Sequence, residues 1–281
     1  MRMLSQEMSS VYITLMTLPS YNILNLNIFE EVNTLNNYNN IYGANYTNQG
    51  VMKNVYILDK QTGDVNGDKI PDTVYLVGEK GENPFYENIK VIVQDNRTMQ
   101  RYIIPLYPNY SLSTDPWIFL GNFTNSNVSD IMINLLTPGS GALTYYYVIS
   151  FYGNKLEYIL GPQQFAAISE PLQYEVIYQD NYKVLVKSEK LDQSYLLDVS
   201  SRKESYEGRV YDKNGKLIRP LEGFVIYIPH LNPIKFDGSL PFKLEAHQDI
   251  AGTARVDGLG QIVSYWKYIG GRKWVLDPEA F

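Results

Sequence analysis

From about residue 52 to the C-terminus, the chain is a succession of short β-type runs with no long helical segment between them. The predicted strands lie at 54–59, 73–79, 88–94, 100–106, 117–120, 130–136, 143–151, 155–160, 174–178, 182–188, 194–199, 208–212, 216–219, 224–228, 242–247, 261–268 and 273–276. Four turn dipeptides each separate two runs: Gly153-Asn154, Asp180-Asn181, Asn214-Gly215 and Gly270-Gly271. This pattern predicts an antiparallel all-β architecture, either β-propeller-like or of stacked sheets.

Residues 1–50 differ from the rest of the chain, because they are rich in asparagine and poor in charge. Apolar residues between 23 and 32 follow Pro19-Ser20 with a spacing that fits a short amphipathic helix. We therefore predict an Asn-rich extension over 1–50, irregular or partly helical, followed by one β-rich domain over 51–281.

Composition excludes several classes of function. The chain has no cysteine, which excludes disulfide scaffolds, thiol catalysis and cysteine-based zinc sites. Its net charge is −6 and its Lys and Arg residues form no cluster, so nucleic acid is not an expected partner. Segment 11–18 is short, bears threonine and is not followed by a small-residue cleavage site. We expect neither a signal peptide nor a membrane span.

Residues 64–72 read Asp-Val-Asn-Gly-Asp-Lys-Ile-Pro-Asp and carry the most specific chemistry in the chain. Side-chain oxygens stand at positions 1, 3, 5 and 9 (Asp64, Asn66, Asp68 and Asp72), and the carbonyl of Ile70 stands at position 7. Calcium takes roughly six to eight oxygen ligands, and a divalent cation relieves the repulsion among closely spaced carboxylates. The spacing predicts one Ca²⁺ bound by these five residues, against the alternative of a solvated acidic turn.

A second copy of this loop follows 58 residues later, because 63–74 aligns without gaps to 121–132. In the second copy Asp130 keeps its carboxylate, whereas Asn122, Thr124 and Ser126 supply neutral oxygens. We expect the second loop to keep its geometry and to bind calcium far more weakly or not at all. The repeat also predicts that the two loops occupy equivalent places in neighbouring structural units.

The segment Gly63 to Val77 resembles the FG-GAP/VCBS repeat, which forms blades of integrin-α-like β-propellers around a calcium loop. Asp249-Ile250-Ala251-Gly252 and the stretch from Trp266 to Trp274 are similar to small VCBS-containing proteins of spore-forming Firmicutes. The resemblance implies calcium-stabilised blades in a non-enzymatic protein with a binding, adhesive or coat role. It also implies a location at the cell or spore surface and a protein or carbohydrate partner.

Two positions depart from calcium loops of known type. Lys69 replaces the usual glycine at position 6, where positive φ costs a non-glycine residue about 1 kcal/mol. Tyr75 stands at position 12 in place of the bidentate glutamate of an EF-hand. We therefore expect weak affinity, on the order of 10⁻⁴–10⁻³ M, and a structural ion rather than a switch.

Catalytic motifs are weak. His230 and His247 lie in different contexts without a His-x-x-x-His motif, which disfavours a histidine metal site. Ser140 lies in Gly-Ser-Gly, which does not match the Gly-x-Ser-x-Gly elbow of serine hydrolases. Glycoside hydrolysis requires two carboxyl groups in one cleft. The candidates, for which a solvated surface position is the simpler interpretation, are Glu30, Glu31, Glu204, Glu207, Asp249 and Asp257.

Aromatic residues offer the other possible ligand surface. Trp117, Trp266, Trp274 and the runs 145–147 and 265–268 have the chemistry to stack on sugar rings or on a partner protein. Such residues more often fill a core, which is the interpretation we favour. A carbohydrate-binding lectin or carbohydrate-active hydrolase is thus the alternative to the non-enzymatic calcium-binding protein.

Overall fold

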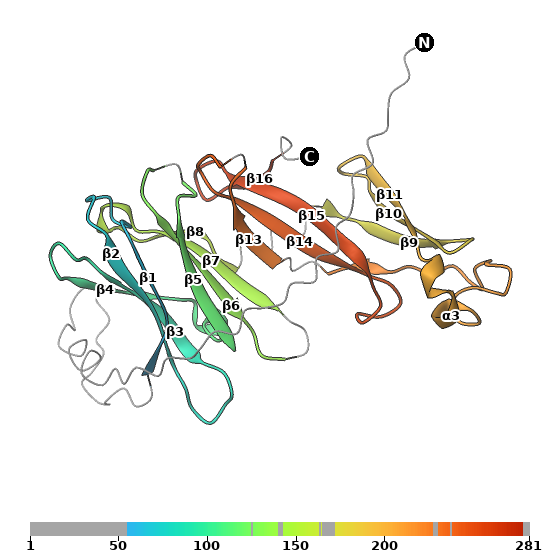
Figure 1. The fold of residues 1–281 in the computed structure, drawn as a ribbon, viewed down its shortest axis with the longest axis horizontal. Helices are drawn as coiled ribbons and strands as arrows, with labels where there is room; N and C mark the ends of the chain where they lie inside the picture. The colour runs from blue at the N-terminus through green and yellow to red at the C-terminus, as the bar shows by residue number, and fades with distance from the viewer. Residues whose placement is uncertain are drawn as a thin grey trace, which may run out of the picture. The chain divides into compact units, whose positions relative to one another are not determined.

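The computed structural model describes residues 55–124, 126–139, 143–162, 164, 172–226, 230–236 and 238–277. Within them the chain forms several antiparallel sheets, and the helical segments are short, so the predicted all-β class is confirmed (Figure 1). The extension predicted over 1–50 lies outside the described residues, as does Ser140. In the described part of the chain, no helix combines the length and the apolar character needed to cross a bilayer.

The fold divides into two compact units. One consists of Gln173–Ile226 and Gln248–Ile262. The other contains the described residues within 55–172, 230–247 and 263–277.

The second of these units begins with two four-stranded meanders of identical strand order (Figure 1). The first contains β1 (Val55–Gly63), β2 (Asp72–Glu79), β3 (Glu87–Gln94) and β4 (Arg101–Pro105). The second contains β5 (Asp115–Gly121), β6 (Asp130–Leu136), β7 (Thr144–Ser150) and β8 (Glu157–Leu160). The sequence repeat of 58 residues therefore corresponds to a repeat of the structure.

The loops of the repeat occupy equivalent places, as the sequence predicts. Gly63 pairs with Asp72 as the last register pair of the first hairpin, and Gly121 pairs with Asp130 in the same way. The two meanders also contact each other directly, because the Ile118 backbone nitrogen donates to Asp59 Oδ2 at 2.7 Å.

The two meanders share one hydrophobic core. Apolar residues from the inner strands of both are buried, and Val74, Val91, Ile131 and Ile149 have no exposed surface. The cluster contains Val65, Val74, Leu76, Ile89, Val91, Val93, Ile104, Leu106, Ile118, Ile131, Ile133, Leu135, Tyr147, Ile149 and Phe151. Burial of this apolar area is the main favourable term in forming the two sheets.

The other unit contains a three-stranded sheet ordered β11-β10-β9, formed by β9 (Glu175–Gln179), β10 (Lys183–Ser188) and β11 (Gln193–Asp198). Two short helices follow it, the 3-10 helix η4 (Ser200–Arg202) and α3 (Lys203–Tyr206). Tyr178, Tyr182, Tyr206 and Tyr211 form a ring cluster here, with centroid distances of 4.5–6.5 Å. Tyrosine thus supplies much of this unit's packing.

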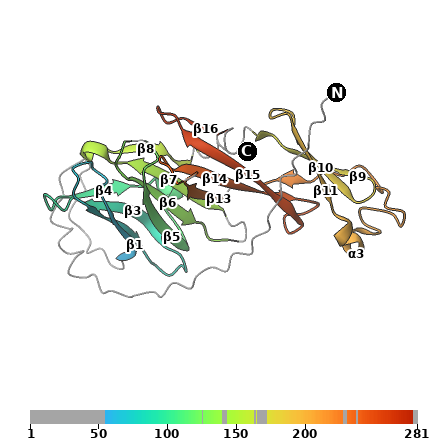
Figure 2. The same ribbon diagram turned by 45° about the horizontal axis from the view of Figure 1, so that its top comes forward.

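The last sheet has the order β12-β14-β15-β16, with β13 paired to β14. Figure 2 labels β13, β14, β15 and β16 of this sheet. Its strands are β12 (Phe224–Val225), β13 (His230–Ile234), β14 (Lys243–Ala251), β15 (Gly258–Tyr268) and β16 (Trp274–Leu276). Asp277, directly after β16, is fully buried and forms ion pairs with Lys243 and Lys267.

Two predicted strands are wrong, and one strand was missed. Residues 208–212 and 216–219 are not strands but a turn with an isolated bridge between Tyr211 and Leu217. The carboxylate of Asp212 accepts hydrogen bonds from the Asn214 and Lys216 amides, which closes a local turn instead of a ladder. Conversely, β13 was not predicted, because prolines at 229 and 233 argue against a strand.

Candidate functional site

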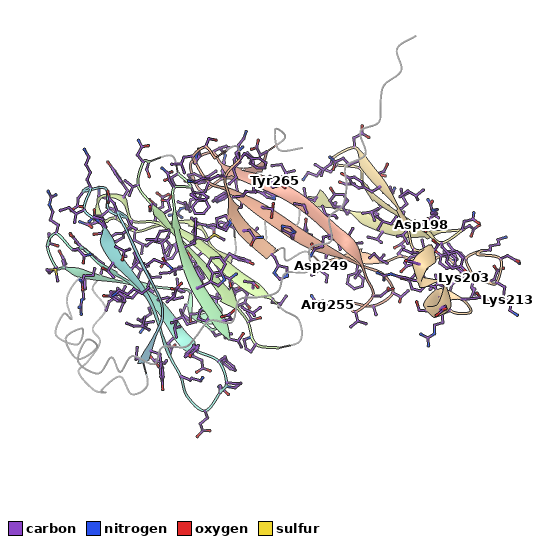
Figure 3. The ribbon with its side chains drawn as sticks, in the orientation of Figure 1. Asp198, Lys203, Lys213, Asp249, Arg255 and Tyr265 are labelled. Carbon is purple, nitrogen blue, oxygen red and sulfur yellow. The ribbon has the colours of Figure 1, made fainter. Side chains whose placement is uncertain are left out.

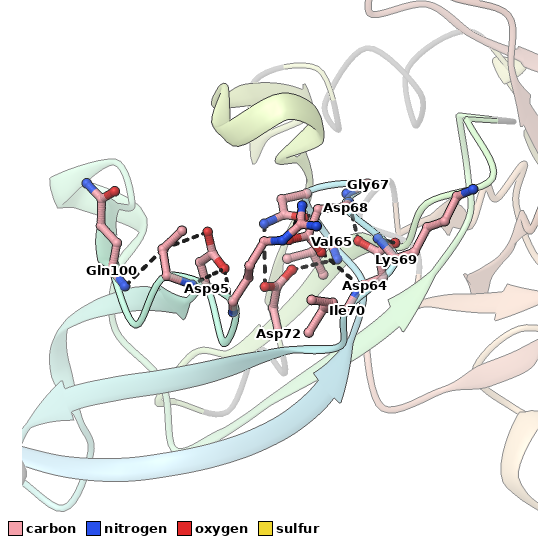
Figure 4. Close-up of polar contacts among 12 residues, drawn as sticks. Asp64, Val65, Gly67, Asp68, Lys69, Ile70, Asp72, Asp95 and Gln100 are labelled. Carbon is pink, nitrogen blue, oxygen red and sulfur yellow. Dashed lines mark hydrogen bonds and ion pairs between the residues drawn. The ribbon is translucent and has the colours of Figure 1, made fainter.

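The predicted calcium loop connects β1 to β2 and ends at the first residue of β2 (Figure 4). Gly63 is the last residue of β1, and Asp72 opens β2 directly opposite it. All five predicted ligand residues therefore lie on a single hairpin connection whose two ends are held by the sheet.

Side chains at alternate positions of the loop turn back onto its own backbone. Asp64 accepts hydrogen bonds from two backbone nitrogens, with Oδ1 at 2.6 Å from that of Gly67 and Oδ2 at 2.9 Å from that of Lys69. Asn66 and Asp68 each accept a hydrogen bond from the backbone nitrogen two residues later in the chain. Their bonds run from the Asp68 nitrogen to Asn66 Oδ1 (2.9 Å) and from the Ile70 nitrogen to Asp68 Oδ1 (2.8 Å).

Two residues of the loop adopt positive φ. Gly67 has a φ of 88° and Lys69 a φ of 70°, and the corresponding residue of the second loop, Asn127, has a φ of 60°. A Cβ at Gly67 would also lie 2.7 Å from Cε2 of Tyr152, so that exposed ring would have to shift. Lys69 thus takes the left-handed conformation expected of a glycine at that position, at the cost of some backbone strain.

Asp72 is the buried carboxylate of the loop. It has no exposed surface, and its Oδ2 accepts a hydrogen bond from the Val65 backbone nitrogen at 3.1 Å. Burial raises the pKa of Asp72, backbone hydrogen bonds oppose this, and the negative charges of Asp95 and Asp68 raise it further. The carboxylate therefore lies in a region where negative charge is unfavourable and a cation would be stabilising.

The turn between β3 and β4 packs against the loop and was not identified from the sequence. Asn96 Nδ2 donates to the Pro71 carbonyl at 2.9 Å, and Arg97 lies 3.6 Å from Asp68. Asp95 opens this turn and accepts hydrogen bonds from the Arg97 and Thr98 amides (Figure 4). Sequence reasoning missed these residues because contact across strands depends on a register that no local motif reveals.

The two repeated loops are connected through the backbone. The Ser129 nitrogen donates to the Asp64 carbonyl at 2.9 Å, and the Gly153 nitrogen donates to the Asn66 carbonyl at 2.8 Å. The second meander thus fixes the first two oxygen-bearing residues of the calcium loop through their main chain.

The second loop is closed by Asp130, which corresponds to Asp72 of the first loop. Asp130 Oδ2 accepts hydrogen bonds from the Phe123 nitrogen at 2.8 Å and the Thr124 nitrogen at 3.0 Å. Phe123 and Val65, at equivalent positions, are both buried. Part of the repeated motif is therefore structural: an apolar residue enters the core, and an aspartate binds its amide.

The donor set fits calcium only in part. Within the described residues, no three His, Cys, Asp or Glu side chains gather into a group that could hold a metal ion. Each loop carboxylate accepts its own hydrogen bonds and does not share a partner with the others. A carboxylate carries about four lone-pair sites, so an oxygen that accepts one N–H keeps a lone pair that can bind a metal ion. Asp68 is further engaged by Arg97, whose side chain is 59% exposed.

Other predicted candidates have structural partners. Asp257 accepts hydrogen bonds from Tyr206 (2.7 Å) and from Arg202 (2.8 Å), and Asp249 from Gln261 (2.8 Å). Burial acts to raise the pKa of Asp257, but the hydrogen bond from Tyr206 and the Arg202 charge hold it below its usual value.

Several of the aromatic candidates belong to the core, as favoured from the sequence. Tyr146, Tyr147 and Trp266 are buried. Trp274 is partly buried, and its indole nitrogen donates to the Ile159 carbonyl at 2.9 Å. These side chains are engaged in packing rather than arranged as a stacking surface.

Comparison with known proteins identifies relatives of the chain. A family model described as the YybI C-terminal domain matches residues 172–280. The uncharacterized protein YybI of Bacillus subtilis (strain 168) is 32% identical over 217 residues, which covers 77% of this chain and 81% of that protein.

These matches overturn the predicted membership of the FG-GAP/VCBS repeat family and of the small VCBS-containing proteins. The resemblance rested on about 15 residues around one loop, and part of that pattern is explained by the hairpin closure at Asp72 and Asp130. A short loop motif is too local to identify a family.

Proposed function

This chain belongs to the YybI family, and we propose that it is a non-enzymatic protein whose first β-meander binds one calcium ion weakly at residues 64–72. The ligands are Asp64, Asn66, Asp68, the Ile70 carbonyl and Asp72, completed by water. The ion neutralises the negative charge of the carboxylates in the loop that connects β1 to β2.

One observation carries this proposal: oxygen-bearing side chains at positions 1, 3 and 5 all fold back onto the loop. Figure 4 labels those at positions 1 and 5, Asp64 and Asp68. The position-9 carboxylate, Asp72, is buried at the base of the same loop beside the charges of Asp68 and Asp95. A hard divalent cation with oxygen preference suits this donor set, since it replaces mutual repulsion by attraction.

Arg97 competes with the ion for Asp68, and its displacement costs little free energy. Arg97 lies 3.6 Å from Asp68, with the Arg97 side chain 59% exposed and the Asp68 side chain 17% exposed. Solvent screening of the exposed guanidinium keeps such a contact weak, on the order of 1 kcal/mol. Calcium binding would release Asp68 from this contact. The missing bidentate ligand and the separate hydrogen bonding of the carboxylates support affinity on the order of 10⁻⁴–10⁻³ M.

Absence of catalysis is part of the proposal and is supported by how the candidate acids are used. Asp257 and Asp249 are bound to neighbouring side chains, and the most buried aromatic residues fill cores. A binding, adhesive or coat role at a cell or spore surface, with a protein or carbohydrate partner, stays a prediction.

Isothermal titration with Ca²⁺ at millimolar concentration tests the proposal. We expect one ion per chain, and at least tenfold weaker binding in Asp68→Asn, which removes a central carboxylate. Asp212→Asn is the matched control, because Asp212 closes a similar turn by accepting two backbone hydrogen bonds. This control should bind calcium like the unmodified protein.

Failure to detect calcium binding at about 10 mM, an order of magnitude above the expected dissociation constant, would reject the proposal. Equal weakening by Asp68→Asn and Asp212→Asn would reject the assigned ligands. Magnesium provides a second comparison, since it demands near-octahedral geometry and should bind more weakly to this irregular donor set.

A further inference from the structure

The two histidines of the chain are direct cross-strand partners. His230 on β13 and His247 on β14 form a register pair, although they are 17 positions apart in the sequence. Residues directly opposite each other in an antiparallel pair point to the same face, with Cβ atoms about 4.5–5.5 Å apart. The fold therefore brings together two histidines that lie in different contexts in the sequence.

The face that carries the histidines is open to solvent. The next register pair, Leu231 and Ala246, is buried, with 1% of each residue exposed. Because side chains alternate along a strand, His230 and His247 lie on the opposite face. His230 is exposed, and the His247 side chain is 25% exposed, so an ion can reach both imidazoles.

A carboxylate already orients one of the two rings. Glu245 lies two residues before His247 on the same face, and its Oε1 is 2.6 Å from His247 Nε2. This contact engages one ring nitrogen and leaves Nδ1 for a ligand. Histidines that bind metals commonly have their second ring nitrogen bound to a carboxylate in this way.

Glu245 is in turn positioned from β15. The neighbouring strand carries Tyr265, labelled in Figure 3, whose hydroxyl is hydrogen-bonded to Glu245. Tyr265 packs edge-on against Phe236, with ring centroids 4.8 Å apart. Lys243, on the same strand as Glu245, is ion-paired with Asp277, and this pair compensates its positive charge.

We propose that His230 and His247 form a binding site for a late first-row divalent cation such as Zn²⁺, with Glu245 as the positioning residue. Imidazole nitrogen suits zinc, copper and nickel, whereas calcium prefers oxygen. The described residues offer no group of three His, Cys, Asp or Glu side chains, so water completes the coordination. The site is independent of the loop at 64–72.

Titration of untagged protein with Zn²⁺, followed by calorimetry and by NMR of the imidazole nitrogens, tests this site. We expect one zinc ion per chain, with shifts in the signals of both histidines. His230→Gln and His247→Gln should each weaken binding at least tenfold, and Glu245→Gln should weaken it less. His230 is exposed, so its replacement is expected to leave the fold intact.

Asp68→Asn is the matched control, since it should weaken calcium binding and leave zinc binding unchanged. His247→Gln should show the converse pattern. Unchanged zinc affinity in both histidine variants, zinc binding without a shift in the two imidazole signals, or no zinc binding at millimolar concentration would each overturn the proposal.

Discussion

The carboxylate of Asp130 accepts a hydrogen bond from the Phe123 backbone nitrogen at 2.8 Å, seven residues earlier in the chain. Asp72 makes the same bond to Val65 in the first meander. Each bond closes a hairpin connection over a buried apolar side chain. The aspartate that ends each repeat therefore has a structural role whether or not calcium binds.

Asp130→Ala should lower the free energy of unfolding by about 2–3 kcal/mol, because it leaves the Phe123 and Thr124 amides without their charged acceptor. Urea unfolding measures the change. Asp115→Ala, at an exposed position on the same sheet, is the control and should change stability by less than about 0.5 kcal/mol. Equal effects of the two substitutions would contradict the structural role.

Asp130 and Asp257 should produce opposite pH dependences. Burial raises the pKa of Asp130 above its ordinary value of 3.8. The folded state then binds a proton before the unfolded state does, so stability relative to Asp130→Asn should rise as the pH falls through the raised pKa towards 3.8.

Asp257 should behave in the opposite sense. Its pKa is held below 3.8, because hydrogen bonds and the Arg202 charge outweigh the effect of burial. Its contribution is present above 3.8 and should be lost as the pH falls through the lowered folded-state pKa. Unfolding of the wild type and of Asp257→Asn between pH 7 and pH 3 measures this difference, and a constant difference over the range would show the assignment wrong.

Asp277 should be among the most sensitive positions in the last sheet. Its carboxylate is fully buried between Lys243 and Lys267, and removal of one partner from a buried ion pair costs about 3–5 kcal/mol. We therefore expect Asp277→Ala to destabilise the protein by that amount in denaturant titrations.

The matched control for Asp277 is Glu157→Gln. Glu157 pairs with Arg272 at 3.7 Å, and both side chains are half exposed or more. Loss of this exposed pair should cost less than about 1 kcal/mol. A cost for Asp277→Ala as small as that of the control would show that the buried cluster contributes little.

Lys69→Gly should raise the free energy of unfolding by up to about 1 kcal/mol, because it relieves a φ of 70°. Lys155 provides the comparison, since it is exposed and has a φ of −113°. Lys155→Gly should lower stability by about 0.5–1 kcal/mol through the added freedom of the unfolded chain. Thermal melts of both variants distinguish these outcomes.

The sequence predicted the fold class and the repeat well, because alternation and turn residues are local signals. The 58-residue offset matches the offset between Asp72 and Asp130 in the two meanders. Prediction from the sequence failed where non-local contacts decide the structure. Proline at 233 concealed β13, and without that strand the pairing of His230 with His247 could not be foreseen. The contacts of Arg97 and Asn96 with the loop also depend on tertiary packing.

Hydrogen exchange of the loop amides, with calcium and with chelator, tests the central claim most directly. The Gly67, Lys69 and Ile70 amides donate to the proposed ligands Asp64 and Asp68. Calcium at about fivefold over its dissociation constant adds about 1 kcal/mol of native-state stability by RT ln(1 + [L]/Kd). We predict slower exchange of these amides with calcium and little change in β14 and β15. Unchanged exchange in the loop at saturating calcium, or protection spread evenly over the whole chain, would contradict the account.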